Sequence, residues 1–197
     1  MWTHNEDLVT SKWLSSVKPS PKSNIVMLRE NGIRCLYHFT DRVNLSSIRT
    51  TGLMSASSLL HSSIPSKMNS DEASRKIDAD SGLKDFVRLS FVPKNPMMYV
   101  SKKEGRVSDV VVLQIKLEAV SRPGVMFADC NAARRDVTIS ESPEVVRFDI
   151  VKAENAFAVP ELLRHFYQAE VLVPSPLPPH LITLPNTKTA TRKQKNR

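Results

Sequence analysis

The sequence predicts an α+β fold with a split, mostly antiparallel β-sheet and peripheral helices, and two observations lead to this prediction. From residue 85 onward the chain contains short apolar runs that suit strands, of which DVVVLQIKL at 109–117 is the strongest. Few helical stretches separate these runs. Short strands with few intervening helices are typical of an α+β domain rather than of alternating β–α units.

The individual elements are assigned from apolar spacing and from residues that end a helix. A strand at 35–39 lies between two expected helices, 25–31 and 44–51, and each helix is followed by a glycine that can end it. The other expected elements are strands at 86–91, 145–151 and 169–173, a serine-rich loop at 55–70, one or two helical turns at 71–77 and a short helix or turn at 160–167.

The length of 197 residues suits one domain with its own core, and 41% hydrophobic residues allow that core to pack. We divide the chain into an N-terminal extension and linker (1–30), a folded domain (31–185) and a basic disordered tail (186–197). No apolar run approaches the ~20 residues that span a membrane, and the start lacks the features of a signal peptide. The two cysteines form no CxxC pair, so we expect a cytoplasmic protein without a disulfide framework.

The charge balance points to a polyanionic partner. The net charge is +8 and the pI is about 9.7. Much of the excess belongs to the tail, which could equally be a solvated end. Basic residues also occur through the body of the chain: Lys102, Lys103, Arg106, Arg134 and Arg135. Charge alone therefore leaves nucleic-acid binding open.

Several common nucleotide and metal motifs are absent. The chain contains no GxGxxG, no GxxxxGK[ST] and no HExxH, and it has only five glycines. A doubly wound dinucleotide fold and a P-loop are therefore not expected. An enzyme of this sequence that used NAD⁺ would bind it outside the Rossmann scheme.

Three segments could carry chemistry, although each has a structural reading as well. His38 lies in the apolar run LYHFT, with Thr40 on the same side of the expected strand. The segment at 85–99 joins a strand to an Asn-Pro turn, which could form the floor of a pocket or simply part of the core. Glu170 opens the run EVLV, where a carboxylate would be either buried or at a wet strand edge.

Taken together, four blocks resemble the DarT family of DNA ADP-ribosyltransferase toxins. The blocks are LYHFT…NL..I…GL, DFV..SF.PKNPMMY, an FxDxNA block that holds Phe127, Asp129, Asn131 and Ala132, and QAEVLV. They cover roughly residues 33–182. The resemblance implies an ADP-ribosyltransferase-like fold that binds NAD⁺ as co-substrate in the cleft of a split sheet, without a metal.

The resemblance also assigns roles to residues. Glu170 takes the place of the catalytic glutamate, and Arg75 that of an arginine between the first two blocks, with Arg49 as a weaker candidate. The expected NAD⁺-binding residues are His38, Thr40, Asn44, Phe91 and Tyr99, with Phe86 as a further ring contact. The expected contacts to single-stranded DNA are Lys94, Arg134, Arg135 and Arg164.

Simple chemistry agrees with these roles. Cleavage of the nicotinamide–ribose bond passes through a transition state with oxocarbenium character, as glycoside hydrolysis does. A carboxylate beside the ribose can hold a hydroxyl, stabilise the positive charge and accept a proton from the attacking base. An arginine offers a fork of donors for the pyrophosphate.

Other readings stay open at this point. Asn131 stands where the thymidine-modifying branch has a histidine, and the spelling is closer to a guanine-modifying branch, so the acceptor base is undecided. The alternatives to DNA modification are an NAD⁺-dependent RNA 2′-phosphotransferase, a non-catalytic nucleic-acid-binding domain and a protein ADP-ribosyltransferase. A toxin of this kind implies a partner, in this family a macrodomain antitoxin that removes ADP-ribose from DNA.

Overall fold

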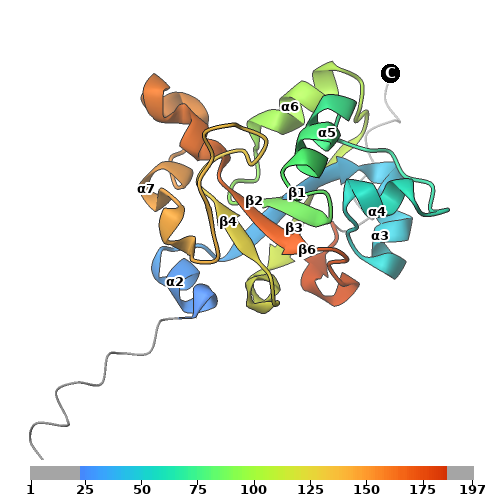
Figure 1. Cartoon of the computed structure of the whole chain (residues 1–197), viewed down its shortest axis with the longest axis horizontal. Helices are drawn as coiled ribbons and strands as arrows, with labels where there is room; N and C mark the ends of the chain where they lie inside the picture. Colours follow the sequence, from blue (N-terminus) through green and yellow to red (C-terminus); the bar gives the residue numbers. More distant parts are fainter. Residues whose placement is uncertain (1–22, 186–197) are drawn as a thin grey trace, which may run out of the picture.

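The computed structural model describes residues 23–185, which form a mixed domain around one antiparallel β-sheet (Figure 1). The strand order is β5-β4-β6-β2-β1-β3-β7. The strands are β1 (Cys35–Asp41), β2 (Phe86–Ser90), β3 (Val110–Lys116), β4 (Met126–Ala128), β5 (Ile139–Ser140), β6 (Glu170–Pro174) and β7 (Ile182–Thr183). All of their pairings are antiparallel, as the sequence predicts for most of the sheet.

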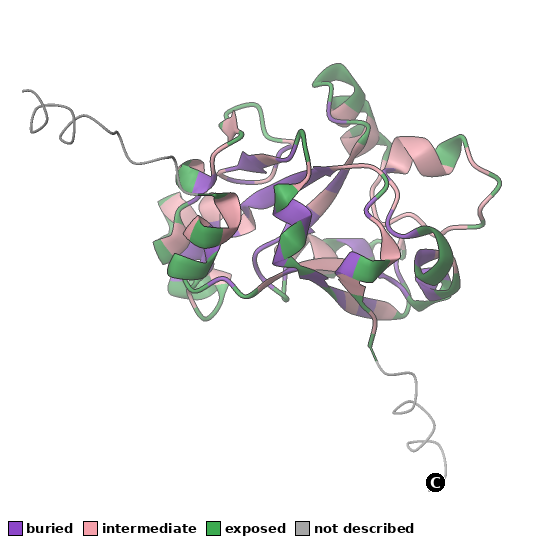
Figure 2. Cartoon of the chain, turned by 90° about the horizontal axis from the view of Figure 1, so that it is seen from below, coloured by how far each residue is buried: buried purple, intermediate pink, exposed green. Residues whose placement is uncertain are grey.

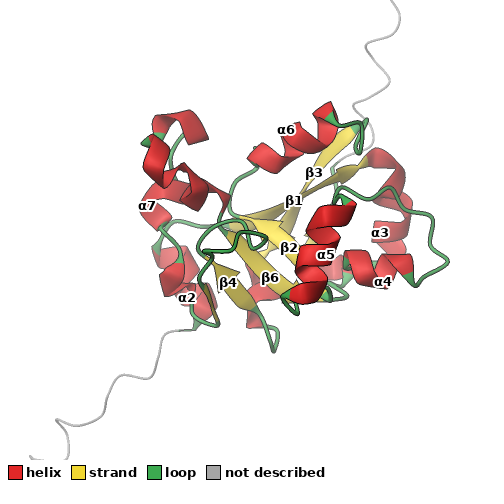
Figure 3. Cartoon of the chain, turned by 45° about the horizontal axis from the view of Figure 1, so that its top comes forward, coloured by secondary structure: helices red, strands yellow, loops and turns green. Residues whose placement is uncertain are grey.

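The sheet is split between β1 and β2. Every residue of β1 pairs with β3, and every residue of β2 pairs with β6. Between β1 and β2, in contrast, the register rests on Tyr37 opposite Ser90. The two halves diverge from this contact, which Figure 3 shows as an opening between β1 and β2. The predicted split is confirmed.

Short helices surround the sheet, and polar caps set where several of them begin. The α-helices are α2 (Asn24–Glu30), α3 (Leu45–Thr51), α4 (Ala56–Leu60), α5 (Glu72–Asp80), α6 (Pro96–Lys103) and α7 (Phe148–Val151). The 3₁₀ helices are η1 (Arg42–Asn44), η2 (Leu117–Ser121), η3 (Pro143–Val145), η4 (Ala156–Ala158), η5 (Glu161–Gln168) and η6 (Pro179–Leu181). The side chains of Ser55, Asp71 and Asn95 accept a backbone N–H at the starts of α4, α5 and α6.

Two of the local predictions were wrong. The run at 145–151 is not a strand, because it contains the end of η3, two linking residues and α7. A short apolar run does not distinguish a buried strand from a buried helix, and here Ser142 and Pro143 start a helical turn instead. The expected loop at 55–70 contains α4, which Ser55 caps.

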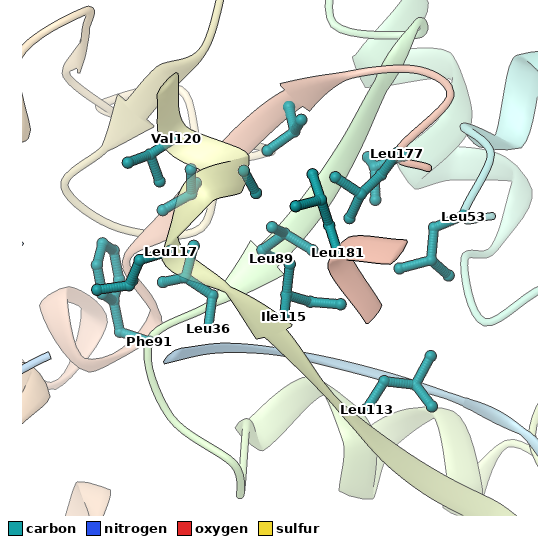
Figure 4. Close-up of a cluster of buried hydrophobic side chains, with 14 of the residues drawn as sticks. Leu36, Leu53, Leu89, Phe91, Leu113, Ile115, Leu117, Val120, Leu177 and Leu181 are labelled. Carbon is teal, nitrogen blue, oxygen red and sulfur yellow. The ribbon is translucent and has the colours of Figure 1, made fainter. Parts of the chain in front are cut away.

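The main core contains the side chains that β1, β2 and β3 bury together with those of the surrounding turns (Figure 4). Leu36, Leu113 and Ile115 are fully buried there. Figure 2 shows that buried residues concentrate in the strands, whereas the helices are largely intermediate or exposed. Leu28 of α2 is also fully buried in this core, so α2 packs as part of the body. The division of the chain at residue 30 stays a prediction.

One glycine is required by a close backbone contact. Gly52 ends α3 with φ +80°, and a Cβ built on it would lie 2.0 Å from the carbonyl oxygen of Leu177. Next to it, Leu53 and Leu177 exchange backbone hydrogen bonds of 2.9 and 2.8 Å. The end of α3 is thereby fastened to the segment after β6.

Within residues 23–185, no helix is long and apolar enough to cross a membrane.

Candidate active site

A cavity lies where β1 and β2 diverge. Residues 37–39 of β1 and 86–90 of β2 form its walls, and α5 contributes Ser74 and Asp78. Glu170, the first residue of β6, and Asn131, from the loop after β4, also line it. Segments from all four sequence blocks therefore line or border one site, although they are far apart in the chain.

Glu170 is buried at this site and shares one oxygen between two donors. Its Oε2 accepts the backbone N–H of Ala132 at 2.9 Å and lies 3.3 Å from Nη1 of Arg88. Among the described residues, Oε1 has no hydrogen-bond partner. The carboxylate is thus held through one oxygen, and the other is available to a ligand.

Burial raises the pKa of Glu170, against the opposing effects of the Arg88 guanidinium and the Ala132 N–H. The negative charge of Asp78 adds to the rise in the Glu170 pKa. A carboxylate whose pKa lies above its ordinary value is a stronger base than a solvated glutamate. The site therefore makes this group suitable for taking up a proton.

Arg88 joins Glu170 to α5. Its Nη2 contacts Oδ1 of Asp78, and its Nη1 also lies 3.4 Å from Oδ1 of Asn131. The side chains of Asp78 and Arg88 are 15% and 22% exposed, so both charges are largely withdrawn from water. The Nε atom of Arg88 is buried without a hydrogen-bond partner. This arginine retains an unused donor beside the cavity.

The FxDxNA block forms a turn against the glutamate. The Oδ1 atom of Asn131 accepts the backbone N–H of Ala133 at 2.9 Å, which shapes the turn. The same turn aims the N–H of Ala132 at Glu170. Asp129 anchors the base of the turn, because its Oδ1 accepts the N–H of Thr138 at 3.0 Å. The block thus positions a backbone donor.

His38 spans the opening in the sheet. Its Nδ1 lies 3.0 Å from the carbonyl oxygen of Arg88, which can only accept, so Nδ1 donates. Burial lowers the pKa of His38, although the bond to Arg88 opposes this. The imidazole is therefore neutral near pH 7, and its Nε2 can accept a hydrogen bond.

Thr40 and Asn44 line a second hollow that adjoins the first and shares His38 with it. The amide of Asn44 donates to Oγ1 of Thr40 at 2.9 Å and to the carbonyl of Lys67 at 2.8 Å. Its Oδ1 accepts the N–H of Lys67 at 2.8 Å. Asn44 therefore holds the 61–71 loop against β1, and in this way it fixes one wall of the second hollow.

Three other predicted site residues lie elsewhere. Arg75 is on α5, but its Nη1 donates to the carbonyl of Ser70 at 2.6 Å and it does not line the cavity. Phe91 is buried in the main core against Phe148. Tyr99 is 57% exposed on α6 and also lies outside the cavity lining. The roles assigned to these residues stay predictions that the geometry does not support.

The four predicted DNA contacts lie outside the cavity lining. Lys94 and Arg135 are exposed, and exposed Arg134 pairs with Asp136 at 2.7 Å. Arg164 donates to the carbonyl of Val159 at 3.1 Å. The basic tail falls outside the described residues.

Sequence reasoning assigned no role to three further residues that the structure singles out, two of them in the cavity. Arg88 and Asp78 were not assigned roles, although an arginine inside an apolar strand is a signal of a buried partner. Phe157 is 85% exposed on η4, and the Arg164 guanidinium lies 5.6 Å from its ring centre. Its ring is therefore open to solvent beside a cation.

The comparison with known families decides the relationship. Residues 37–196 match the family model described as "ssDNA thymidine ADP-ribosyltransferase, DarT". The chain belongs to the DarT family. A curated relative, the "DNA ADP-ribosyl transferase-DNA ADP-ribosyl glycohydrolase fusion protein" of Thermosipho africanus (strain H17ap60334), is 28% identical over 160 residues. That match takes in 76% of this chain and 41% of the relative, so this chain spans under half of the relative's length.

Solved DarT structures share the fold. DarT of Thermus sp. 2.9 in complex with ADP-ribosylated ssDNA superposes with a TM-score of 0.62 and 21% identity, covering 79% of this chain and 83% of that one. The same protein in complex with NAD⁺ gives a TM-score of 0.58. Thermosipho africanus DarTG in complex with ADP-ribose gives 0.57 at 25% identity, over 76% of this chain and 43% of that one. The predicted ADP-ribosyltransferase-like fold is confirmed.

Proposed function

We propose that this chain transfers ADP-ribose from NAD⁺ to a base of single-stranded DNA and releases nicotinamide. The observation that carries the proposal is the buried carboxylate of Glu170, held through Oε2 and free at Oε1, in the cleft of the split sheet. DarT family membership supports the same activity. In this reaction the bond from nicotinamide nitrogen to ribose C1′ breaks and a bond from C1′ to the DNA base forms.

The two adjoining hollows suit a dinucleotide. They share His38 and Asn69, and together they extend along β1 from Glu170 to Asn44. Several polar groups line them, and Asn69 and Ser70 line both. When bound here, NAD⁺ supplies the ADP-ribosyl group and the nicotinamide leaving group.

Each residue of the cleft has a separate role in the proposed reaction. Glu170 can hold a ribose hydroxyl through Oε1, stabilise positive charge at C1′ and accept the proton that the attacking base loses. Arg88 keeps the carboxylate in place. His38 presents the acceptor Nε2 to a ribose hydroxyl or an amide. Arg75 remains a second candidate for the family's arginine, because its neighbour Ser74 lines the cavity.

The acceptor side is a proposal based on charge and exposure. The net charge of +8 favours a polyanion, and an unpaired base can enter a cleft without the cost of opening a duplex. Phe157 with Arg164 offers a ring and a guanidinium, the pairing on which bases of single strands stack. Lys94, Arg134 and Arg135 are further candidates for phosphate contacts.

The biological setting follows from the activity. A cytoplasmic enzyme that modifies DNA without restraint harms its own cell, so we propose a macrodomain partner that reverses the reaction. The fusion protein of Thermosipho africanus combines a transferase with a glycohydrolase, which supports such a pairing. We further propose that the transfer needs no metal.

The proposal is tested by incubating the protein with NAD⁺ and four single-stranded oligonucleotides, each with one reactive base type in an otherwise fixed context. A duplex and an RNA of matching sequence run beside them. Mass spectrometry then looks for the addition of one ADP-ribosyl group. The family description makes thymine the first base to examine, and the sequence around Asn131 makes guanine the second.

An adduct on one DNA base, with release of nicotinamide, is the expected result. Adducts only on RNA would make RNA the acceptor instead of DNA. Loss of the 2′-phosphate from an added RNA that carries one, with consumption of NAD⁺, would favour the phosphotransferase alternative. Unchanged NAD⁺ with every acceptor would leave a nucleic-acid-binding domain as the better account.

A further inference from the structure

The carboxylate of Asp78 lines the cavity but has no role in the transfer as proposed above. Its Oδ1 contacts one Nη of Arg88, and the other Nη of Arg88 faces Glu170. The result is a carboxylate–guanidinium–carboxylate chain that runs from α5 through β2 to β6. All three side chains are largely buried, with exposures of 15%, 22% and 10%.

We propose that Asp78 is a positioning residue for the transfer reaction, which holds the Arg88 guanidinium against Glu170 and offsets part of its charge. This inference rests on the proposed function, because it explains how the proposed base is kept in place. Asp78 itself has no need to touch the substrate. It acts through Arg88.

Distances show why Arg88 needs a second anchor. Its Nη1 lies 3.3 Å from Glu170 and 3.4 Å from Asn131, whereas charge-assisted hydrogen bonds usually measure about 2.7–2.9 Å. Its Nε has no partner. The contact with Asp78 is the one that ties the guanidinium to α5.

Packing does not explain why Asp78 lies there. None of the residues of α5 is buried, so the helix contributes no fully buried side chain to any core. Asp71 at its start lies 3.9 Å from Arg106, and Asp78 contacts Arg88, so ion pairs hold the helix over the cavity. The ion pair is thus a feature of the site rather than a by-product of a packed helix.

The charges around Glu170 predict how loss of Asp78 acts. Arg88 lowers the pKa of Glu170, and Asp78 raises it. Lys84 and Arg106 also line the cavity, but among the described residues neither pairs with Glu170, and Arg106 pairs with Glu104 at 2.7 Å. His38 is neutral near pH 7 because burial lowers its pKa. Removing Asp78 therefore removes one of the two effects that raise the pKa of Glu170, and this pKa should fall.

The test compares Asp78→Asn with Asp80→Asn and Asp78→Glu. Asp80 is exposed at the end of the same helix and is the matched control for loss of one carboxylate. Initial rates of ADP-ribose transfer to a single-stranded oligonucleotide are measured from acid to neutral pH, with KM for NAD⁺ at each point. Melting temperatures identify variants that do not fold, and Asp78→Ser then repeats the removal of charge with a smaller side chain.

For Asp78→Asn we expect kcat at neutral pH to fall about 10- to 100-fold, since small displacements of a reacting group cost this much. The acidic limb of the profile moves to lower pH, while KM for NAD⁺ changes little. Asp78→Glu restores much of the rate, and Asp80→Asn matches the wild type. An unchanged limb with a neutral-pH kcat within twofold of wild type would overturn the inference.

Failure of the proposed function is recognised separately. If the wild type transfers no ADP-ribose, the proposed function fails, and the coupling is then measured by ¹³C NMR titration of the Glu170 carboxyl. A lower midpoint in Asp78→Asn than in Asp80→Asn supports the link through Arg88. Equal midpoints refute it.

Discussion

Nη1 of Arg88 lies 3.3 Å from Oε2 of Glu170, across the ladder that joins β2 to β6. In this ladder Arg88 pairs with Leu172 and Ser90 pairs with Glu170, so the two charged residues are diagonal neighbours. Ser90 is also the residue through which β2 meets β1. The carboxylate, its arginine and the opening of the sheet therefore depend on the same few residues of β2.

The first prediction ranks the two arginines. Arg88→Lys removes the fork that reaches Asp78 and Glu170 together, and we expect kcat to fall about 100-fold. Arg75→Lys should have a much smaller effect, because Arg75 does not line the cavity and its Nη1 is already engaged by the carbonyl of Ser70. Both variants are compared with the wild type in steady-state transfer to DNA. A larger fall for Arg75→Lys than for Arg88→Lys would instead assign the catalytic arginine to Arg75.

The second prediction concerns pH. The rate should fall as the pH drops through the raised pKa of Glu170, because only the carboxylate can accept a proton. Burial lowers the pKa of His38, so this residue is neutral at pH 7 and can present the acceptor Nε2 to a ligand. His38→Gln should therefore raise KM for NAD⁺ without moving the acidic limb. The pH–rate profiles of the wild type and His38→Gln provide the measurement. Loss of the acidic limb in His38→Gln would show that the limb reports His38 and not Glu170.

The third prediction concerns DNA binding. Phe157 is 85% exposed with Arg164 at its ring, so its removal should not affect folding. Stacking of a base on an aromatic side chain contributes about 1–3 kcal/mol. Phe157→Ala should weaken binding of a single-stranded oligonucleotide about 10-fold, and Phe157→Trp should retain it. Fluorescence anisotropy at fixed salt measures both, and equal affinity of all three proteins would remove this face from the DNA path.

The fourth prediction tests a backbone contact. Gly52→Ala places a Cβ 2.0 Å from the carbonyl of Leu177 and also strains a positive φ. Gly105 has a similar φ of +74° but open space around it, so Gly105→Ala serves as the control for backbone strain alone. We expect Gly52→Ala to lose about 2 kcal/mol more in free energy of unfolding than the control. Denaturant melts of the two variants would show equal losses if the contact had no effect.

Much of the fold could be predicted from the sequence, for identifiable reasons. The strands β1, β2, β3 and β6 are apolar runs of five to seven residues, long enough to show their character. The strands β4 and β5 have three and two residues, too few for any pattern. The run at 145–151 was mistaken for a strand because apolar residues suit a buried helix equally well.

The site could be predicted only in part. His38 was placed correctly in a strand and Glu170 at the start of one, and the structure brings both to the cavity. The roles of Arg88 and Asp78 depend on the register between β2 and β6 and on where α5 lies. Neither follows from local spacing. Phe91 was predicted to contact NAD⁺, but its side chain is buried in the main core instead.

The most direct test of the account is transfer of ADP-ribose to single-stranded DNA by Glu170→Gln beside the wild type. Glutamine keeps an acceptor for the N–H of Ala132 and removes a buried charge, so the variant should fold at least as stably as the wild type. We predict a fall in kcat of about 100- to 1000-fold with little change in the melting temperature. Wild-type transfer by a folded Glu170→Gln protein would contradict the central claim that this carboxylate performs the reaction.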